Sequence, residues 1–86
     1  MAEAYSLPFP RIVRNPRVLS GEPTVSGTRV SVRVIVETLR QDGDIASLLD
    51  AFPRLTREDI EDALAFYEAN RAEIDHYIQE NEDALA

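Results

Sequence analysis

The chain has 86 residues, of which 44% are hydrophobic and 29% charged, so it suits one small folded domain and is too short for two separate cores. It contains no cysteine, which argues against a disulfide-stabilised secreted domain and against a thiolate zinc site. No apolar run approaches the roughly 20 residues of a membrane span, and the first residues lack the basic and apolar segments of a signal peptide. We therefore expect a cytoplasmic protein.

The charges are segregated along the chain. Residues 1–40 hold six arginines and three acids, a net charge of +3, whereas residues 41–86 hold three arginines and 13 acids, a net charge of −10. Such asymmetry between the halves predicts two surfaces with different partners. An acidic solvated face that keeps the protein in solution accounts for part of it.

Residues 1–31 are interrupted by proline or glycine at six positions, which excludes a long helix there. Short β-favouring pieces at residues 12–14, 23–25 and 29–30 predict an N-terminal β arm with a small hairpin. Two short strands are only marginally stable in water, so we expect them to need a further sheet partner. A second copy of the chain would supply it and make the protein a homodimer.

From residue 32 the apolar residues recur at helical spacing. Three successive stripes at i, i+3, i+4 and i+7 predict three helices, which make residues 32–70 a three-helix core. The stripes are Val32, Ile35, Val36 and Leu39; Ile45, Leu48, Leu49 and Phe52; and Ile60, Ala63, Leu64 and Tyr67.

Residues between the stripes supply start and stop signals. Ser31, Asp44 and Thr56 are predicted N-caps, because their side-chain oxygens can accept hydrogen bonds from the first free backbone N–H groups of each helix. Gly43 suits the left-handed residue after the first helix, and Pro53 stops the second. The predicted fold class is mainly α, with a three-helix, helix-turn-helix core behind the β arm.

No proline or glycine ends the third helix after Tyr67, and Ile74 and Ile78 continue its apolar face seven and eleven residues later. A continuous helix over about residues 56–82 would be roughly 40 Å long at 1.5 Å per residue, which overshoots a three-helix core.

Residues 71–86 are therefore predicted to form an acidic helical extension whose apolar stripe meets a protein partner. The alternative is a separate fourth helix that folds back on the domain through a break near Asn70.

Catalytic constellations are absent from the sequence. The glycine-containing segment 21–29 lacks the spacing and the lysine of a phosphate-binding loop. His76 and Glu80, four residues apart, suit an exposed helix ion pair, and the acids near residue 60 suit a solvated helix face better than a metal site. We expect no enzyme activity, no cofactor and no bound metal.

The second and third predicted helices, joined by a tight turn, also suit a DNA-binding helix-turn-helix. However, residues 56–62 at the start of the third helix hold one arginine and four acids, which phosphates would repel. If the protein binds DNA, the candidate residues are the arginines of the arm and first helix, namely Arg11, Arg14, Arg17, Arg29, Arg33 and Arg40.

Several short motifs together resemble a known family. In chain order they are Gly21-x-Pro23, Gly27-Thr28-Arg29-Val30-x-Val32, Gly43 and Phe52-Pro53-x-Leu55-Thr56-x-x-Asp59-Ile60-x-x-Ala63-Leu64. Over about residues 11–70 the chain is similar to the domain-of-unknown-function family 433. Relatives usually have a basic residue at the position of Glu22, often Arg at that of Ser26, and Pro at that of Ser31.

The resemblance implies a small homeodomain-like helix-turn-helix protein that acts as a VapB-type antitoxin against a toxin with a PIN-like RNase fold. In that role the C-terminal helix would occlude the toxin through an apolar stripe and acids, with Tyr67, Ile74, Tyr77, Ile78, Glu73 and Glu80 as candidate contacts. A DNA-binding regulator of its own operon is the alternative, and a structural adaptor subunit is a third possibility.

Overall fold

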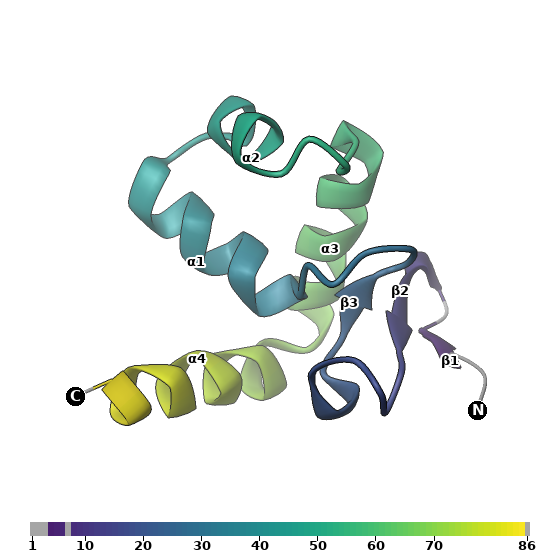
Figure 1. Ribbon diagram of the computed structural model, residues 1–86, viewed down its shortest axis with the longest axis vertical. Helices are drawn as coiled ribbons and strands as arrows, with labels where there is room; N and C mark the ends of the chain where they lie inside the picture. Colours follow the sequence, from purple (N-terminus) through teal and green to yellow (C-terminus); the bar gives the residue numbers. More distant parts are fainter. Residues whose placement is uncertain (1–3, 7, 86) are drawn as a thin grey trace.

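The computed structural model describes residues 4–6 and 8–85, which form a small antiparallel sheet and four α-helices (Figure 1). A single 3₁₀ turn, Leu19–Gly21, lies between the second and third strands. The strands are β1 (Ala4–Ser6), β2 (Phe9–Arg14) and β3 (Thr24–Val25), and the helices are α1 (Val32–Asp42), α2 (Ile45–Ala51), α3 (Arg57–Ala69) and α4 (Arg71–Leu85).

The sheet has the order β1-β2-β3, so β2 has a partner on both sides within one chain. Ile12 lies opposite Val25 and Val13 opposite Thr24 in the β2–β3 pair. The predicted hairpin is thus confirmed, but residues 29–30 are not a strand. They close a turn in which the Val25 N–H donates to the Val30 carbonyl. Because β1 and α3 already cover β2, the sheet does not require a second copy of the chain.

The predicted caps of the first three helices are confirmed. The Ser31 hydroxyl accepts from Val34 N at 3.0 Å, and the Asp44 carboxylate accepts from Ser47 N at 2.8 Å. Thr56 and Asp59 form a reciprocal capping box at the start of α3. Gly43 adopts the left-handed conformation, with φ 86°, after the last turn of α1. Local sequence signals therefore set these helix boundaries.

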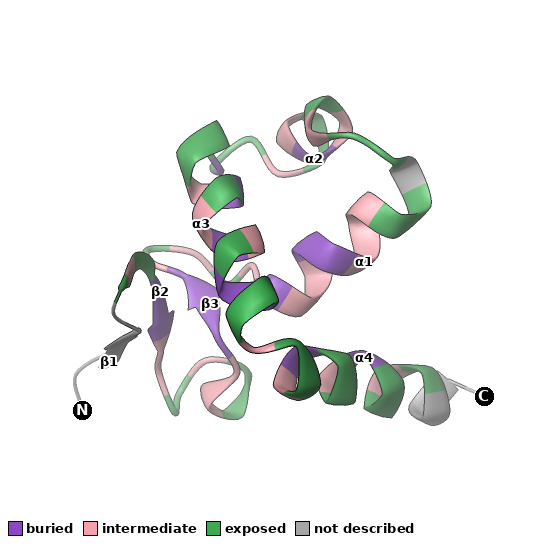
Figure 2. Ribbon diagram, turned by 180° about the vertical axis from the view of Figure 1, so that it is seen from behind, coloured by how far each residue is buried: buried purple, intermediate pink, exposed green. Residues whose placement is uncertain are grey.

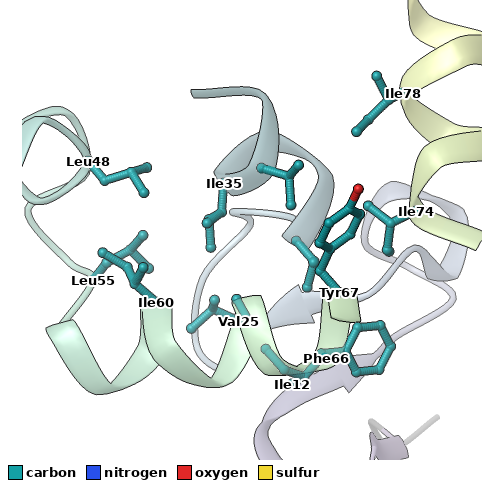
Figure 3. Close-up of a cluster of buried hydrophobic side chains, with 13 residues drawn as sticks. Ile12, Val25, Ile35, Leu48, Leu55, Ile60, Phe66, Tyr67, Ile74 and Ile78 are labelled. Carbon is teal, nitrogen blue, oxygen red and sulfur yellow. The ribbon is translucent and has the colours of Figure 1, made fainter. Parts of the chain in front are cut away.

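The core lies where α1, α2, α3 and α4 meet one another and the sheet, and its side chains come from all these elements (Figures 2 and 3). All three predicted stripes contribute to it, fully or in part. The buried members are Ile12, Val25, Val32, Ile35, Val36, Leu48, Leu55, Ile60, Ala63, Phe66, Tyr67, Ile74 and Ile78.

The predicted continuous third helix is wrong, and the alternative with a break near Asn70 is right. Asn70 has φ −137° and ψ 39°, which ends α3, and its side-chain amide donates to the Phe66 carbonyl at 3.0 Å. Helix α4 then turns back and packs against α1 (Figure 1). The physical reason is that the turn places Ile74 and Ile78 in the core instead of in water.

Candidate functional site

The apolar residues proposed for toxin binding are mostly inside the domain. Ile74 is 0% exposed and Ile78 4%, and both point toward Tyr67 and the α1 side of the core (Figure 3). Tyr67 is itself buried, and Tyr77 is partly buried against the core. The expectation that this stripe lies free for a partner is therefore wrong, because α4 uses it to hold its own domain together.

Arg14 and Glu73 form a clamp between the sheet and α4. Two guanidinium nitrogens of Arg14 donate to the two carboxylate oxygens of Glu73 at 2.6 and 2.8 Å, and Arg14 lies over the Phe66 ring. The Tyr77 hydroxyl donates to Glu73 at 2.9 Å. Hydrogen bonding from Arg14 lowers the pKa of Glu73, whereas burial and the contact with Glu73 raise the pKa of Tyr77. Arg14, a candidate DNA contact, and Glu73, a candidate toxin contact, thus bind each other.

A second contact joins α1 to α4 through Arg40. Its guanidinium donates to the Tyr67 hydroxyl at 2.9 Å, and that hydroxyl donates to Asp75 at 2.8 Å. The hydrogen bond to Asp75 is the main cause that raises the pKa of Tyr67. Arg40 also lies 3.4 Å from an oxygen of Asp75. This candidate DNA contact therefore fixes α4 to the rest of the fold.

Arg33 and Arg11 are also bound to acids of the same chain. Partly buried Arg33 donates to Glu22 at 3.0 Å and to Glu37 at 2.7 Å, so Glu22 fixes the 3₁₀ turn region to α1. Arg11 donates to Asp59 at 3.3 Å, and its backbone N–H donates to Asp62. These pairs fix the β arm to α1 and α3.

Two of the six candidate DNA-binding arginines are exposed and have no side-chain partner among the described residues. Within the described part of the chain, the side chains of Arg17 and Arg29 make no hydrogen bond or ion pair. The same holds for Arg54 and Arg57, which lie in the turn before α3 and at its first residue. Sequence reasoning gave these last two little weight, although their place at a helix-turn-helix turn was a signal.

The outer face of α3 is acidic. Glu58 and Glu61 are exposed, and within residues 4–6 and 8–85 neither takes part in a hydrogen bond or ion pair. On α4 the candidate toxin contact Glu80 is also exposed, 3.5 Å from the ring nitrogen of His76. Glu82, near the end of α4, is exposed as well. Free negative charge is thus concentrated on the two C-terminal helices.

The turn between β2 and β3 carries the only non-glycine residues with positive φ among those described. Leu19 has φ 49° and Ser20 has φ 56°, and Gly21 follows with φ 88°. Leu19 is also the one large apolar side chain found exposed in the described ranges, at 42%. Left-handed backbone at non-glycine residues is strained, and no sequence signal predicted it here.

The described residues enclose no pocket and bring together no group of three or more potential metal ligands. In the same ranges, none of the helices is both long and apolar enough to cross a membrane. The candidate site is therefore an exposed surface formed by α3 and the turn that precedes it.

The family model described as "Protein of unknown function (DUF433)" matches residues 12–67, well over half of the chain. The chain belongs to the DUF433 family. It is also similar to the crystal structure of a DUF433 member protein from Anabaena variabilis, at 33% sequence identity and a TM-score of 0.77. That similarity covers 80% of this chain and 68% of the other. A search among curated proteins found no match.

The DUF433 match begins in β2 and ends at Tyr67, so it includes the helix-turn-helix core and stops before the break at Asn70. Helix α4 lies outside the matched segment, yet it supplies two buried core residues, Ile74 and Ile78. In this chain the DUF433 core and α4 therefore form a single packed unit.

Proposed function

We propose that the protein is the antitoxin of a toxin–antitoxin pair and binds a PIN-like RNase toxin through the exposed acidic face of α3. The observation that supports this is the division of charge at the surface. Glu58 and Glu61 point away from the core without a partner among the described residues, whereas Arg11, Arg14, Arg33 and Arg40 are bound to acids of the same chain.

The exposed carboxylates of Glu58 and Glu61 are complementary to the basic groups of a cationic partner. An RNase must hold the phosphates of its substrate with basic side chains, and an acidic protein face competes for them. The apolar stripe of α4 is not part of this interface, because its isoleucines are in the core. The acids of α3 thus replace it as the contact surface in the proposal.

The first test is the identity of the flanking reading frames. A PIN-like RNase encoded beside this gene supports the proposal, and flanking genes without one contradict it. The purified RNase should then lose activity on an RNA substrate when this protein is added at equal concentration.

Charge reversal locates the interface. Glu58→Lys with Glu61→Lys should weaken inhibition at least tenfold, because two attractive contacts become repulsive. The matched control is Glu80→Lys with Glu82→Lys on α4, which makes the same change in net charge and should alter inhibition much less. Equal losses in the two double variants would indicate a general effect of net charge and would contradict an interface on α3.

DNA binding is the second candidate function, and exposed Arg54 and Arg57 at the start of α3 favour it. Against it, Glu58 and Glu61 follow on the same helix and would face the phosphates. We expect the protein to bind duplex DNA from its own promoter no more tightly than about 10⁻⁵ M at physiological salt, as measured by fluorescence anisotropy. Sequence-specific binding at nanomolar concentration that is lost in Arg57→Ala would make DNA the better-supported partner.

A further inference from the structure

The break between α3 and α4 is one residue long. Only Asn70 departs from helical geometry, with φ −137° and ψ 39°, and helix resumes at Arg71. No glycine or proline occurs after Pro53, and the residues on both sides of Asn70 are good helix formers. Local sequence thus favours a continuous helix, and the turn depends on packing and on the Asn70 side chain at the Phe66 carbonyl.

A helix that ran straight through Asn70 would leave its own domain. From Arg57 to Leu85 it would span roughly 43 Å at 1.5 Å per residue, whereas the longest dimension of the whole chain is 33 Å. Ile74 and Ile78 would then leave the core, and Glu73 and Asp75 would leave Arg14 and Arg40. The straight form therefore exposes the apolar stripe of α4 and also the surface of the core that this stripe covers in the folded chain.

We propose that two copies of the chain exchange α4, with Asn70 as the hinge, to form a two-fold symmetric dimer. A second copy is the occupant that fits, because its vacated surface offers the same apolar contacts and the same two arginines to the incoming helix. The exchange keeps the contacts of α4 and adds helical hydrogen bonds across the former break. The existing contact between Glu68 and Arg71 spans the hinge at the i, i+3 spacing of a helix.

The Arg14–Glu73 clamp provides a direct test of exchange. Arg14→Glu places two acids together within one chain, and Glu73→Arg places two arginines together, so neither variant forms the clamp alone. In an exchanged heterodimer of the two variants, both contacts join opposite charges. Glu73 of the Arg14→Glu chain pairs with Arg14 of the Glu73→Arg chain, and the two substituted residues pair with each other at the second contact. The two variants are unfolded together in urea, refolded and examined by native mass spectrometry.

Exchange predicts that the heterodimer is more abundant than either homodimer by at least tenfold. A statistical mixture of dimers, or monomers alone, would overturn the proposal. A dimer formed through the free edge of β1 would give the statistical mixture, because its contact does not require the clamp. Circular dichroism of each variant confirms that it retains helical structure before mixing.

Substitution of the hinge is an independent test that leaves the clamp intact. Asn70→Ala removes the side-chain cap on Phe66 and favours continuous helix at both hinges of the dimer, so dimerisation should tighten on the order of a hundredfold. Asn81→Ala is the matched control, because Asn81 donates to the Tyr77 carbonyl at 3.1 Å, the same i−4 contact, within an unbroken helix. Sedimentation that shows Asn70→Ala with the association of wild type would contradict the hinge.

Discussion

Ile74→Ala tests whether α4 belongs to the core of the domain. Ile74 is 0% exposed and packs within the cluster that includes Tyr67 and Ile78 (Figure 3). Truncation to Ala removes buried methyl and methylene groups and leaves a cavity that the neighbouring helices fill only in part. Such substitutions cost about 2–5 kcal/mol, and we expect about 3 kcal/mol here.

That loss is large for a domain of this size. At 0.05–0.15 kcal/mol per residue, the free energy of unfolding of the whole chain is about 4–13 kcal/mol. A loss of about 3 kcal/mol corresponds to a fall in Tm of about 15 °C for a domain of 60–100 residues. Urea unfolding followed by circular dichroism, at a protein concentration low enough to keep the chain monomeric, measures both the midpoint and the slope.

The matched control is His76→Ala on the outer face of the same helix, which should change stability by less than about 0.5 kcal/mol. A cost below about 1 kcal/mol for Ile74→Ala, with an unchanged slope, would show that α4 does not pack as described. The stripe would then be free for a partner, and the occlusion mechanism expected from the sequence would regain its support.

Two further predictions concern the clamp and the strained turn. Arg14 holds the pKa of Glu73 below its ordinary value, so the pair stabilises the fold at neutral pH and this contribution is lost as the pH falls below about 4.3. Glu73→Gln should therefore cost roughly 1 kcal/mol at pH 7 and flatten the acid limb of the stability–pH curve, whereas Glu80→Gln on the exposed face of the same helix should cost less than about 0.5 kcal/mol at pH 7. Ser20→Gly should stabilise the protein by about 0.5 kcal/mol, because glycine adopts positive φ without strain, while Ser47→Gly within α2 should destabilise it by a similar or larger amount in the same thermal unfolding assay.

Much of the fold was predictable because its signals are local. Ser31, Asp44 and Thr56 cap the predicted helices, since a cap depends on residues two or three positions away. The β2–β3 hairpin and the apolar stripes follow from spacing alone. The left-handed residues Leu19 and Ser20 carried no such signal, because non-glycine residues adopt positive φ only when the surrounding turn imposes it.

From the sequence, the break at Asn70 was only an alternative, because its neighbours favour helix. The turn depends on burial of the distant isoleucines and on the Asn70 side chain at the Phe66 carbonyl. The pairing of the candidate site residues could not be predicted for a related reason. Arg14 and Glu73 are 59 residues apart, and no periodicity pairs them. Each was interpreted as a free surface charge, because the sequence does not show which distant residue it pairs with. Exposed Glu58 and Glu61, by contrast, were correctly placed on a solvated helix face.

The difference in charge between the two halves of the chain also has a structural role, which does not depend on any partner. Three ion pairs join residues 1–40 to residues 41–86: Arg11 with Asp59, Arg14 with Glu73 and Arg40 with Asp75. These contacts hold the sheet on α3 and hold α4 on the sheet and α1, so the arm is not a free segment. Once they are formed, Arg17 and Arg29 are the arginines of the first half whose side chains have no hydrogen bond or ion pair among the described residues. The exposed acids without such a partner include Glu58 and Glu61 of α3 and Glu82 near the end of α4. This distribution supports the proposal of a cationic partner at α3, where the phosphates of a nucleic acid would face Glu58 and Glu61.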